Sequence, residues 1–167
     1  MFRKVEDFLE AYRRDSESTL KILNALTDES LSQPVAEGHR LLGGVAWHIA
    51  MTIPEMMPRT GLSIEGFDIH AMPPASAAEI AAAYQRGVEA LLNEVEANWD
   101  DETLMVEDDM YGMQWKRGQT LAILIAHETH HRGQLTVLMR QAGLTVPGIL
   151  GPAKEDWAKH GMEEPPY

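Results

Sequence analysis

Four stretches of the chain repeat apolar residues at steps of three and four positions, the spacing of one face of an α-helix. They cover roughly residues 5–26, 40–57, 76–99 and 120–141. A chain of 167 residues, 44% of them hydrophobic, is long enough to bury a substantial core. Four amphipathic helices in a chain of this size predict an all-α fold, a four-helix bundle that forms a single domain over residues 1–167.

The segments between these stretches refine the prediction. The connection between the second and third stretches has about 18 residues, which allows a long crossover between helices 2 and 3 instead of a tight antiparallel turn. Ser76 and Glu79 have the spacing of a capping box and predict the start of the third helix. Residues 100–118 contain short alternating pieces that predict a small β-hairpin.

The charge pattern argues against nucleic acids and membranes as partners. The formal net charge is −12, and no dense block of lysine and arginine is present. Binding to a phosphate backbone or to an anionic lipid surface depends on clustered cations. The longest purely apolar run, Leu121–Ala126, is far shorter than the roughly 18 residues that a membrane span needs.

The chain has no cysteine, which excludes a thiol nucleophile, a thiolate zinc site and a disulfide scaffold. A composition without cysteine fits a reducing compartment. The first fifteen residues carry four basic and four acidic side chains where a signal peptide would have an apolar core. We therefore expect a cytoplasmic protein.

Three of the seven histidines lie close together in the fourth helical stretch, at His127, His130 and His131. At ~100° per residue, His131 lies about 40° from His127 and one turn along, so the two share a face. That face looks inward, because it also carries Ile123, Leu124 and Leu138. Two imidazoles one turn apart can bind a single metal ion. Glu128 and His130 flank this face, each about 80° to one side.

A metal held by two protein ligands would be weakly bound, so a third ligand is expected from another helix. His48 is the best candidate, because it lies in the apolar segment GGVAWHIAM of the second helical stretch. Leaving a buried imidazole unpaired would cost about 1–3 kcal/mol. Its alternative role is that of a hydrogen-bonded core residue. Three histidine ligands would leave coordination positions open, as in catalytic metal sites.

Residues 127–131 also match the H-E-x-x-H pattern of zinc proteases, with Glu128 as general base. The longer metzincin pattern fails, because Val137 stands where the third histidine is required. A thermolysin-like site would need a downstream glutamate, and Glu155 lies in a segment rich in proline and glycine. A protease is therefore the weaker interpretation.

A second resemblance covers nearly the whole chain. The run HETHHRGQLTVLMRQAG, the upstream His48 and the following VPGILGP resemble the DinB/YfiT-like family. The resemblance is most specific at the three histidines and at Arg132, Gly133 and Gln134. It implies a four-helix bundle with a long crossover, a homodimer, and a divalent ion bound by His48, His127 and His131. Zinc is the metal expected first, with nickel or iron as alternatives.

Several members of that family are transferases or isomerases that use low-molecular-weight thiols. The resemblance therefore implies a metal-dependent thiol S-transferase that acts on a small molecule. Because the chain has no cysteine, the thiol must come from a cosubstrate. Glu128, His130 and Gln134 are candidates to orient the ligands or to relay protons. A metal-dependent hydrolase and a non-catalytic metal- or small-molecule-binding stress protein remain alternatives.

Overall fold

The computed structural model describes residues 1–166 and is mostly helical, with one small two-stranded sheet. The long helices are α1 (Val5–Leu23), α2 (Leu42–Met56), α3 (Ala77–Asn98) and α4 (Arg117–Gln141). Short 3₁₀ segments are η1 (Glu29–Ser32), η2 (Met57–Thr60), η3 (Thr103–Met105) and η4 (Lys154–His160). The prediction of a mostly helical fold is confirmed.

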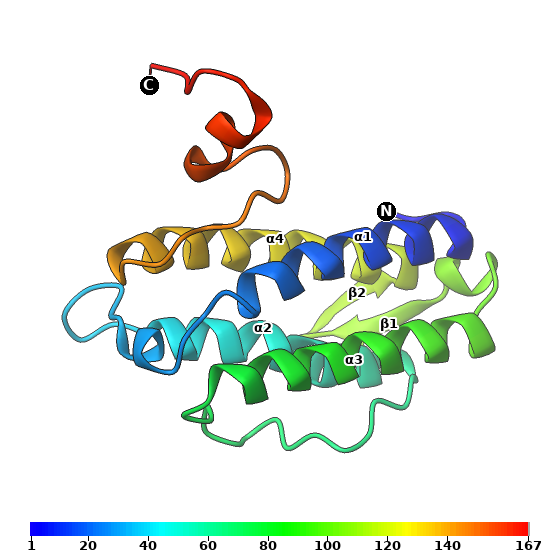
Figure 1. Ribbon diagram of the computed structural model, residues 1–167. Coiled ribbons are helices and arrows are strands. Elements are labelled where there is room, and N and C mark those ends of the chain that lie inside the picture. Colours follow the sequence, from blue (N-terminus) through cyan, green and yellow to red (C-terminus); the bar gives the residue numbers. More distant parts are fainter. Residues whose placement is uncertain (167) are drawn as a thin grey trace.

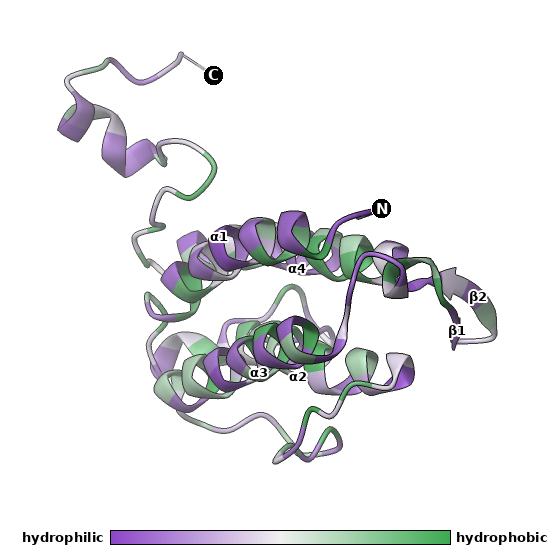
Figure 2. Ribbon diagram, turned by 90° about the vertical axis from the view of Figure 1, so that its right-hand side faces the viewer, coloured by the Kyte–Doolittle hydropathy of each residue, from purple (hydrophilic) through white to green (hydrophobic). Residues whose placement is uncertain are grey.

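The four long helices lie in two layers, α1 with α4 and α2 with α3 (Figure 1). Contacts also cross between the layers, because α1 contacts α3 and α2 contacts α4. Hydrophobic and hydrophilic residues alternate along the helices, as expected when one side of each helix faces a shared core (Figure 2). Helices α2 and α3 run in the same direction, and residues 61–76 return along the length of their layer (Figure 1).

Helix α1 ends at Leu23, although the apolar spacing continues to Leu26. Beyond Leu23 the backbone keeps turning with tighter hydrogen bonds, from the Ala25 N–H to the Ile22 carbonyl and from the Leu26 N–H to the Leu23 carbonyl. Leu26 therefore stays in the core with 7% exposure. The periodicity of side chains outlasts the α-helix because a 3₁₀ turn carries the chain in nearly the same direction.

Ser76 precedes α3 as predicted, but the capping-box prediction is wrong, because the Ser76 side chain forms no capping hydrogen bond. The first N–H group of the helix, at Ala77, instead donates to Oδ1 of Asp28 at 2.7 Å. An aspartate from the connection after α1 thus supplies the hydrogen-bond acceptor for the first N–H group of α3. This bond joins α3 to the segment between α1 and α2.

The predicted hairpin is confirmed as strands β1 (Glu107–Met110) and β2 (Met113–Lys116), which pair antiparallel. Its two turn residues, Tyr111 and Gly112, have φ values of 61° and 83°. Two positive φ angles characterise the type I′ turn of two-residue hairpins. Strand β2 leads directly into α4, so this helix begins at Arg117, earlier than the apolar pattern near residue 120 indicates.

The C-terminal residues leave the two layers. The segment that contains η4 extends away from the four helices (Figures 1 and 2). An ion pair between Arg140 and Glu155, at 3.3 Å, links it to the end of α4. Across residues 1–166, no helix has the combined length and apolar character that crossing a membrane requires.

Candidate metal centre

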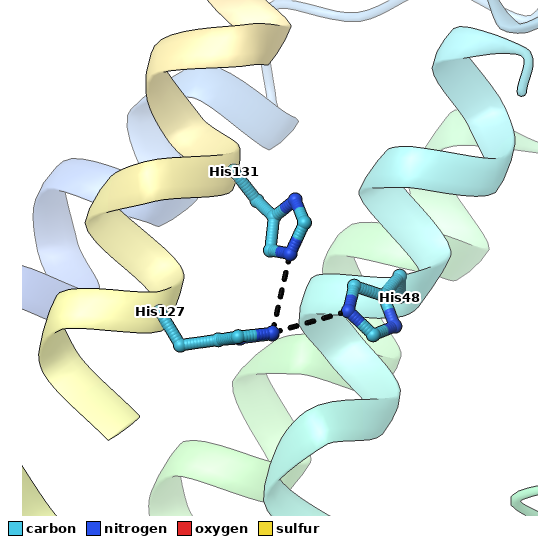
Figure 3. Close-up of side chains that lie close together, drawn as sticks. All are labelled: His48, His127 and His131. Carbon is cyan, nitrogen blue, oxygen red and sulfur yellow. Dashed lines mark hydrogen bonds between the residues drawn. The ribbon is translucent and has the colours of Figure 1, made fainter. Parts of the chain in front are cut away.

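The three predicted ligands meet between α2 and α4 (Figure 3). Nε2 of His127 lies 3.2 Å from Nε2 of His48 and 3.1 Å from Nε2 of His131. One ring nitrogen from each histidine falls within 4.8 Å of the others. The spacing of one turn on α4 supplies two ligands, and the contact between α2 and α4 supplies the third.

These separations fit a single divalent ion. Two metal–nitrogen bonds of about 2.0–2.1 Å at a tetrahedral angle place their nitrogens about 3.3 Å apart. The separations of 3.1 and 3.2 Å around His127 are close to that value. With three ligands from the protein, a tetrahedral ion would keep one position open to a water or a substrate.

Gln134 determines which ring nitrogen of His131 keeps a lone pair that can bind a metal. Its Oε1 lies 2.7 Å from Nδ1 of His131, one turn away on α4. An amide oxygen only accepts hydrogen bonds, so Nδ1 carries the proton and Nε2 keeps its lone pair. A hydrogen-bond partner of this kind is typical of metal-ligating histidines, because it holds the ring in its ligating orientation.

Hydrogen bonds among the three rings cannot satisfy them all. Nε2 of His131 has no proton, so it can only accept one from Nε2 of His127. Nε2 of His127 then has no lone pair left for His48, which lies on its other side. Nδ1 of His127 is also buried, without a hydrogen-bond partner in residues 1–166. A cation that accepts three lone pairs resolves the conflict at the Nε2 atoms, so the donor set fits a metal.

The surroundings keep all three imidazoles neutral, which is the form that binds metals. The pKa of His48 is lowered to about 4, mainly by burial and to a smaller extent by the neighbouring His131 and His127. Burial is also the largest cause of the lowered pKa of His127 and of His131. At neutral pH a metal ion would therefore meet little competition from protons.

Glu128, the glutamate of the H-E-x-x-H pattern, points toward α1 and α3. Its side chain is fully buried, with 0% exposure. The hydroxyl of Tyr12 donates to Oε1 at 2.8 Å, and the hydroxyl of Tyr84 donates to Oε2 at 2.5 Å. Burial raises the pKa of Glu128 to about 7, although the two tyrosine hydrogen bonds act in the opposite direction. Both carboxylate oxygens thus accept hydrogen bonds from tyrosines of the core. This position does not support the interpretation of Glu128 as the general base of a zinc protease.

Arg132 extends this buried cluster. It is 1% exposed, and its Nη2 donates to Oδ1 of Asp15 on α1 at 2.8 Å. Its Nη1 also donates to the Thr19 hydroxyl at 2.9 Å. Oγ1 of Thr19 in turn donates to Oε2 of Glu128 at 3.5 Å. The Arg132 and Glu128 side chains therefore attach α4 to α1 through polar contacts, while the histidines occupy the side that faces α2.

The remaining predicted residues have different positions. His130 is exposed, and its Nε2 lies 3.2 Å from Nε2 of Gln134, so it borders the metal centre through that amide. Glu155 pairs with Arg140 in the C-terminal segment and is not part of the histidine cluster. Sequence reasoning missed Tyr12 and Tyr84, whose only signal was the position of a polar aromatic side chain on a buried helical face.

A pocket of about 520 Å³ opens beside His131. Its polar lining comes from His39, Arg40, Gln134 and Gln141, and apolar side chains complete it. A second hollow of about 640 Å³ lies along α1 and includes none of the three histidines. Because His131 is part of its lining, this pocket can place a small molecule next to a bound ion.

Comparison with known proteins identifies a family and a relative of similar length. Residues 1–165 match the DinB family. Over 165 residues, or 99% of each chain, the sequence is 43% identical to the uncharacterized protein YrdA of Bacillus subtilis strain 168.

Solved structures extend the similarity to the fold. The crystal structure of a DinB-like protein from Bacillus cereus ATCC 10987 superposes with a TM-score of 0.85 at 45% identity. That alignment covers 89% of this chain and 99% of the other. The DinB-like protein YjoA of Bacillus subtilis superposes with a TM-score of 0.64 at 18% identity, over 87% of this chain and 98% of the other. At that identity the likeness concerns the fold alone.

Proposed function

The chain belongs to the DinB family, and from this premise we propose that it is a divalent-metal-dependent transferase that uses a low-molecular-weight thiol. The observation that carries the proposal is the convergence of His48, His127 and His131 beside an open pocket. We also assign the helices to a four-helix bundle with a long crossover. The parallel course of α2 and α3 supports that assignment (Figure 1).

In this proposal the three histidines hold the ion through their Nε2 atoms. Zinc is the metal expected first, and nickel or iron are alternatives, because ligation by histidine alone suits all three. When bound, a divalent ion with an open position supplies Lewis acidity, which lowers the pKa of a water or thiol ligand. Gln134 keeps His131 in the ligating tautomer through the bond to Nδ1.

The pocket supports a small-molecule reaction. Its volume of about 520 Å³ lies within the range of about 300–1,000 Å³ that is typical of ligand sites. The chain contributes no cysteine, so the sulfur nucleophile has to be a cosubstrate. We propose that this cosubstrate enters through the pocket beside His131, while the electrophile approaches the same open side of the ion.

A direct test measures thiol transfer with protein loaded with zinc, nickel or iron. The thiol is 2-mercaptoethanol and the electrophile is 1-chloro-2,4-dinitrobenzene. The sulfur forms a bond to the ring carbon, chloride leaves with its electron pair, and the thiol proton passes to the buffer. We expect release of the thioether by the loaded wild type at a rate about tenfold or more above that of His48→Ala.

The alternatives predict other results. Metal-dependent cleavage of a simple ester without thiol transfer would favour a hydrolase. A protein that binds one ion but accelerates neither reaction above the free metal would favour a non-catalytic metal- or small-molecule-binding protein. Either result would contradict the proposed transferase.

We further propose that the chain forms a homodimer, as the family resemblance implies. The C-terminal segment supports this, because it extends from the helices and carries Leu150 with 80% of its surface exposed. Light scattering after size-exclusion chromatography tests the proposal, and a mass near 18.7 kDa would contradict it. The cytoplasmic location and the absence of a nucleic-acid partner stay predictions.

A further inference from the structure

Arg40 lies two residues before the start of α2 at Leu42, and it is one of the residues that line the pocket beside His131. Arg13, Arg14, Arg59, Arg117, Arg132 and Arg140 each form an ion pair with a carboxylate. Within residues 1–166, the guanidinium of Arg40 forms no such pair. Arg40 is therefore a solvent-exposed cation at the edge of this pocket, without an ion-pair partner among the described residues.

Arg40 lies close to the candidate metal centre, because it lines the same pocket as His131, one of the three predicted ligands. Arg40 and the ion would act on the same bound molecule from two directions.

The rest of the pocket combines apolar and polar residues, which suits a small ligand that has both kinds of group. Val45, Val137 and Leu138 supply apolar walls, and Gln141 supplies an amide. A guanidinium presents a planar set of N–H donors that matches the two oxygens of a carboxylate. A protein of strong negative charge repels anions at long range, so an anionic ligand needs a local cation of this kind.

We propose that Arg40 binds an oxyanion group, a carboxylate in the first instance, on the thiol cosubstrate whose sulfur reaches the metal. This inference rests on the proposed function and adds the chemical class of its cosubstrate. His39 lines the same pocket and offers a second hydrogen-bond donor to the anion. A thiol without a negative group would lose these contacts while keeping its access to the ion.

The test uses four thiols with the same two-carbon spacing and different end groups. They are 3-mercaptopropionate, 2-mercaptoethanesulfonate, neutral 2-mercaptoethanol and cationic cysteamine. Calorimetric titration of zinc-loaded full-length protein gives a Kd for each, and elemental analysis confirms the zinc content. The four thiols also differ in acidity, so their Kd values are not compared directly. The informative quantity is the ratio of the Kd values of two thiols, and how that ratio changes between wild type and variant.

We expect Arg40→Gln to reduce the preference for 3-mercaptopropionate over 2-mercaptoethanol by about fivefold, and Arg40→Lys to restore part of it. Higher salt should shrink the wild-type preference. Arg13→Gln, which removes the same charge from the exposed surface of α1, should leave the preference unchanged. A loss confined to the carboxylate identifies a carboxylate site, and an equal loss for the sulfonate identifies a general oxyanion site; both support the proposal.

Other outcomes distinguish a failure of the role of Arg40 from a failure of the transferase proposal. If the loaded protein binds the thiols and Arg40→Gln keeps the wild-type preference, the role of Arg40 is overturned and the transferase proposal stands. If zinc is absent after loading, or no thiol binds the loaded protein, the proposed function fails and the role of Arg40 fails with it.

Discussion

His127 and Glu128 are neighbours in the chain, yet their side chains contact different helices. Nε2 of His127 lies 3.2 Å from Nε2 of His48 on α2, whereas Oε2 of Glu128 accepts a hydrogen bond of 2.5 Å from the Tyr84 hydroxyl on α3. Adjacent helical residues point about 100° apart, so a single turn of α4 can supply a metal ligand and a buried anchor. The H-E-x-x-H spacing thus belongs to a histidine site whose glutamate is part of the core.

Removing the carboxylate of Glu128 should destabilise the fold without emptying the metal centre. Glu128→Ala leaves the hydroxyls of Tyr12 and Tyr84 without their acceptor, and we expect a loss of about 3 kcal/mol in the free energy of unfolding. Glu128→Gln keeps an acceptor oxygen and should cost about 1 kcal/mol. Urea denaturation and metal analysis measure both effects.

The matched control is Glu17→Ala on the exposed side of α1, which should change stability by less than about 0.5 kcal/mol. A folded Glu128→Gln protein that has lost its metal would contradict this account, because it would place the carboxylate in the metal centre.

The raised pKa of Glu128 also predicts a pH dependence of stability. Burial raises this pKa from 4.5 to about 7, so the folded protein holds the proton more tightly than the unfolded chain. The resulting stability is fully present below the unfolded value and is lost as the pH rises through about 7. In metal-free protein, the stability of wild type relative to Glu128→Gln should fall by up to about 3 kcal/mol between about pH 5 and about pH 8.

Chemical denaturation at several pH values measures this difference. The histidines titrate in both proteins, so their contribution cancels in the comparison. A difference that stays flat or rises with pH would show that Glu128 is ionised throughout.

Gln134 should act as a positioning residue for His131. Gln134→Ala removes the acceptor of the bond to Nδ1, and partners of this kind typically contribute about 10–100-fold to metal affinity. Competition with a chelator measures the affinity. Gln134→Glu keeps an acceptor at the same place and should restore most of it. Equal affinity in Gln134→Ala and wild type would remove this role.

The histidine site was predictable because its information is local. His127 and His131 are four residues apart, so helical geometry alone puts them on one face. His48 could be paired with them because it is an imidazole in an apolar helix, which requires a partner. The helical angle alone does not separate His130 from Glu128, because both lie about 80° from this face, yet His130 is exposed and Glu128 is buried.

Other parts of the site depend on contacts between distant segments. Tyr12 is 116 residues from Glu128, and Tyr84 is 44 residues from it, so periodicity could not show that they share a hydrogen-bonded cluster. In the sequence Arg40 is a charged residue near a helix start, and only the folded chain, in which α2 contacts α4, shows that it shares a pocket with His131.

Helix boundaries were less predictable than helix positions for a similar reason. Side-chain spacing continues through the 3₁₀ turn after α1, and Asp28 replaces the expected cap of α3. The first feature depends on backbone–backbone hydrogen bonds and the second on a bond from a backbone N–H to a side-chain carboxylate, and the apolar pattern indicates neither.

The most direct measurement of the central claim is elemental analysis of protein purified without an affinity tag, with His48→Ala and His130→Ala beside the wild type. Three ligands from two helices predict about one divalent ion per chain in wild type and in His130→Ala, and almost none in His48→Ala. An ion retained in full by His48→Ala, or a wild type that binds none after reconstitution, would contradict the histidine metal centre.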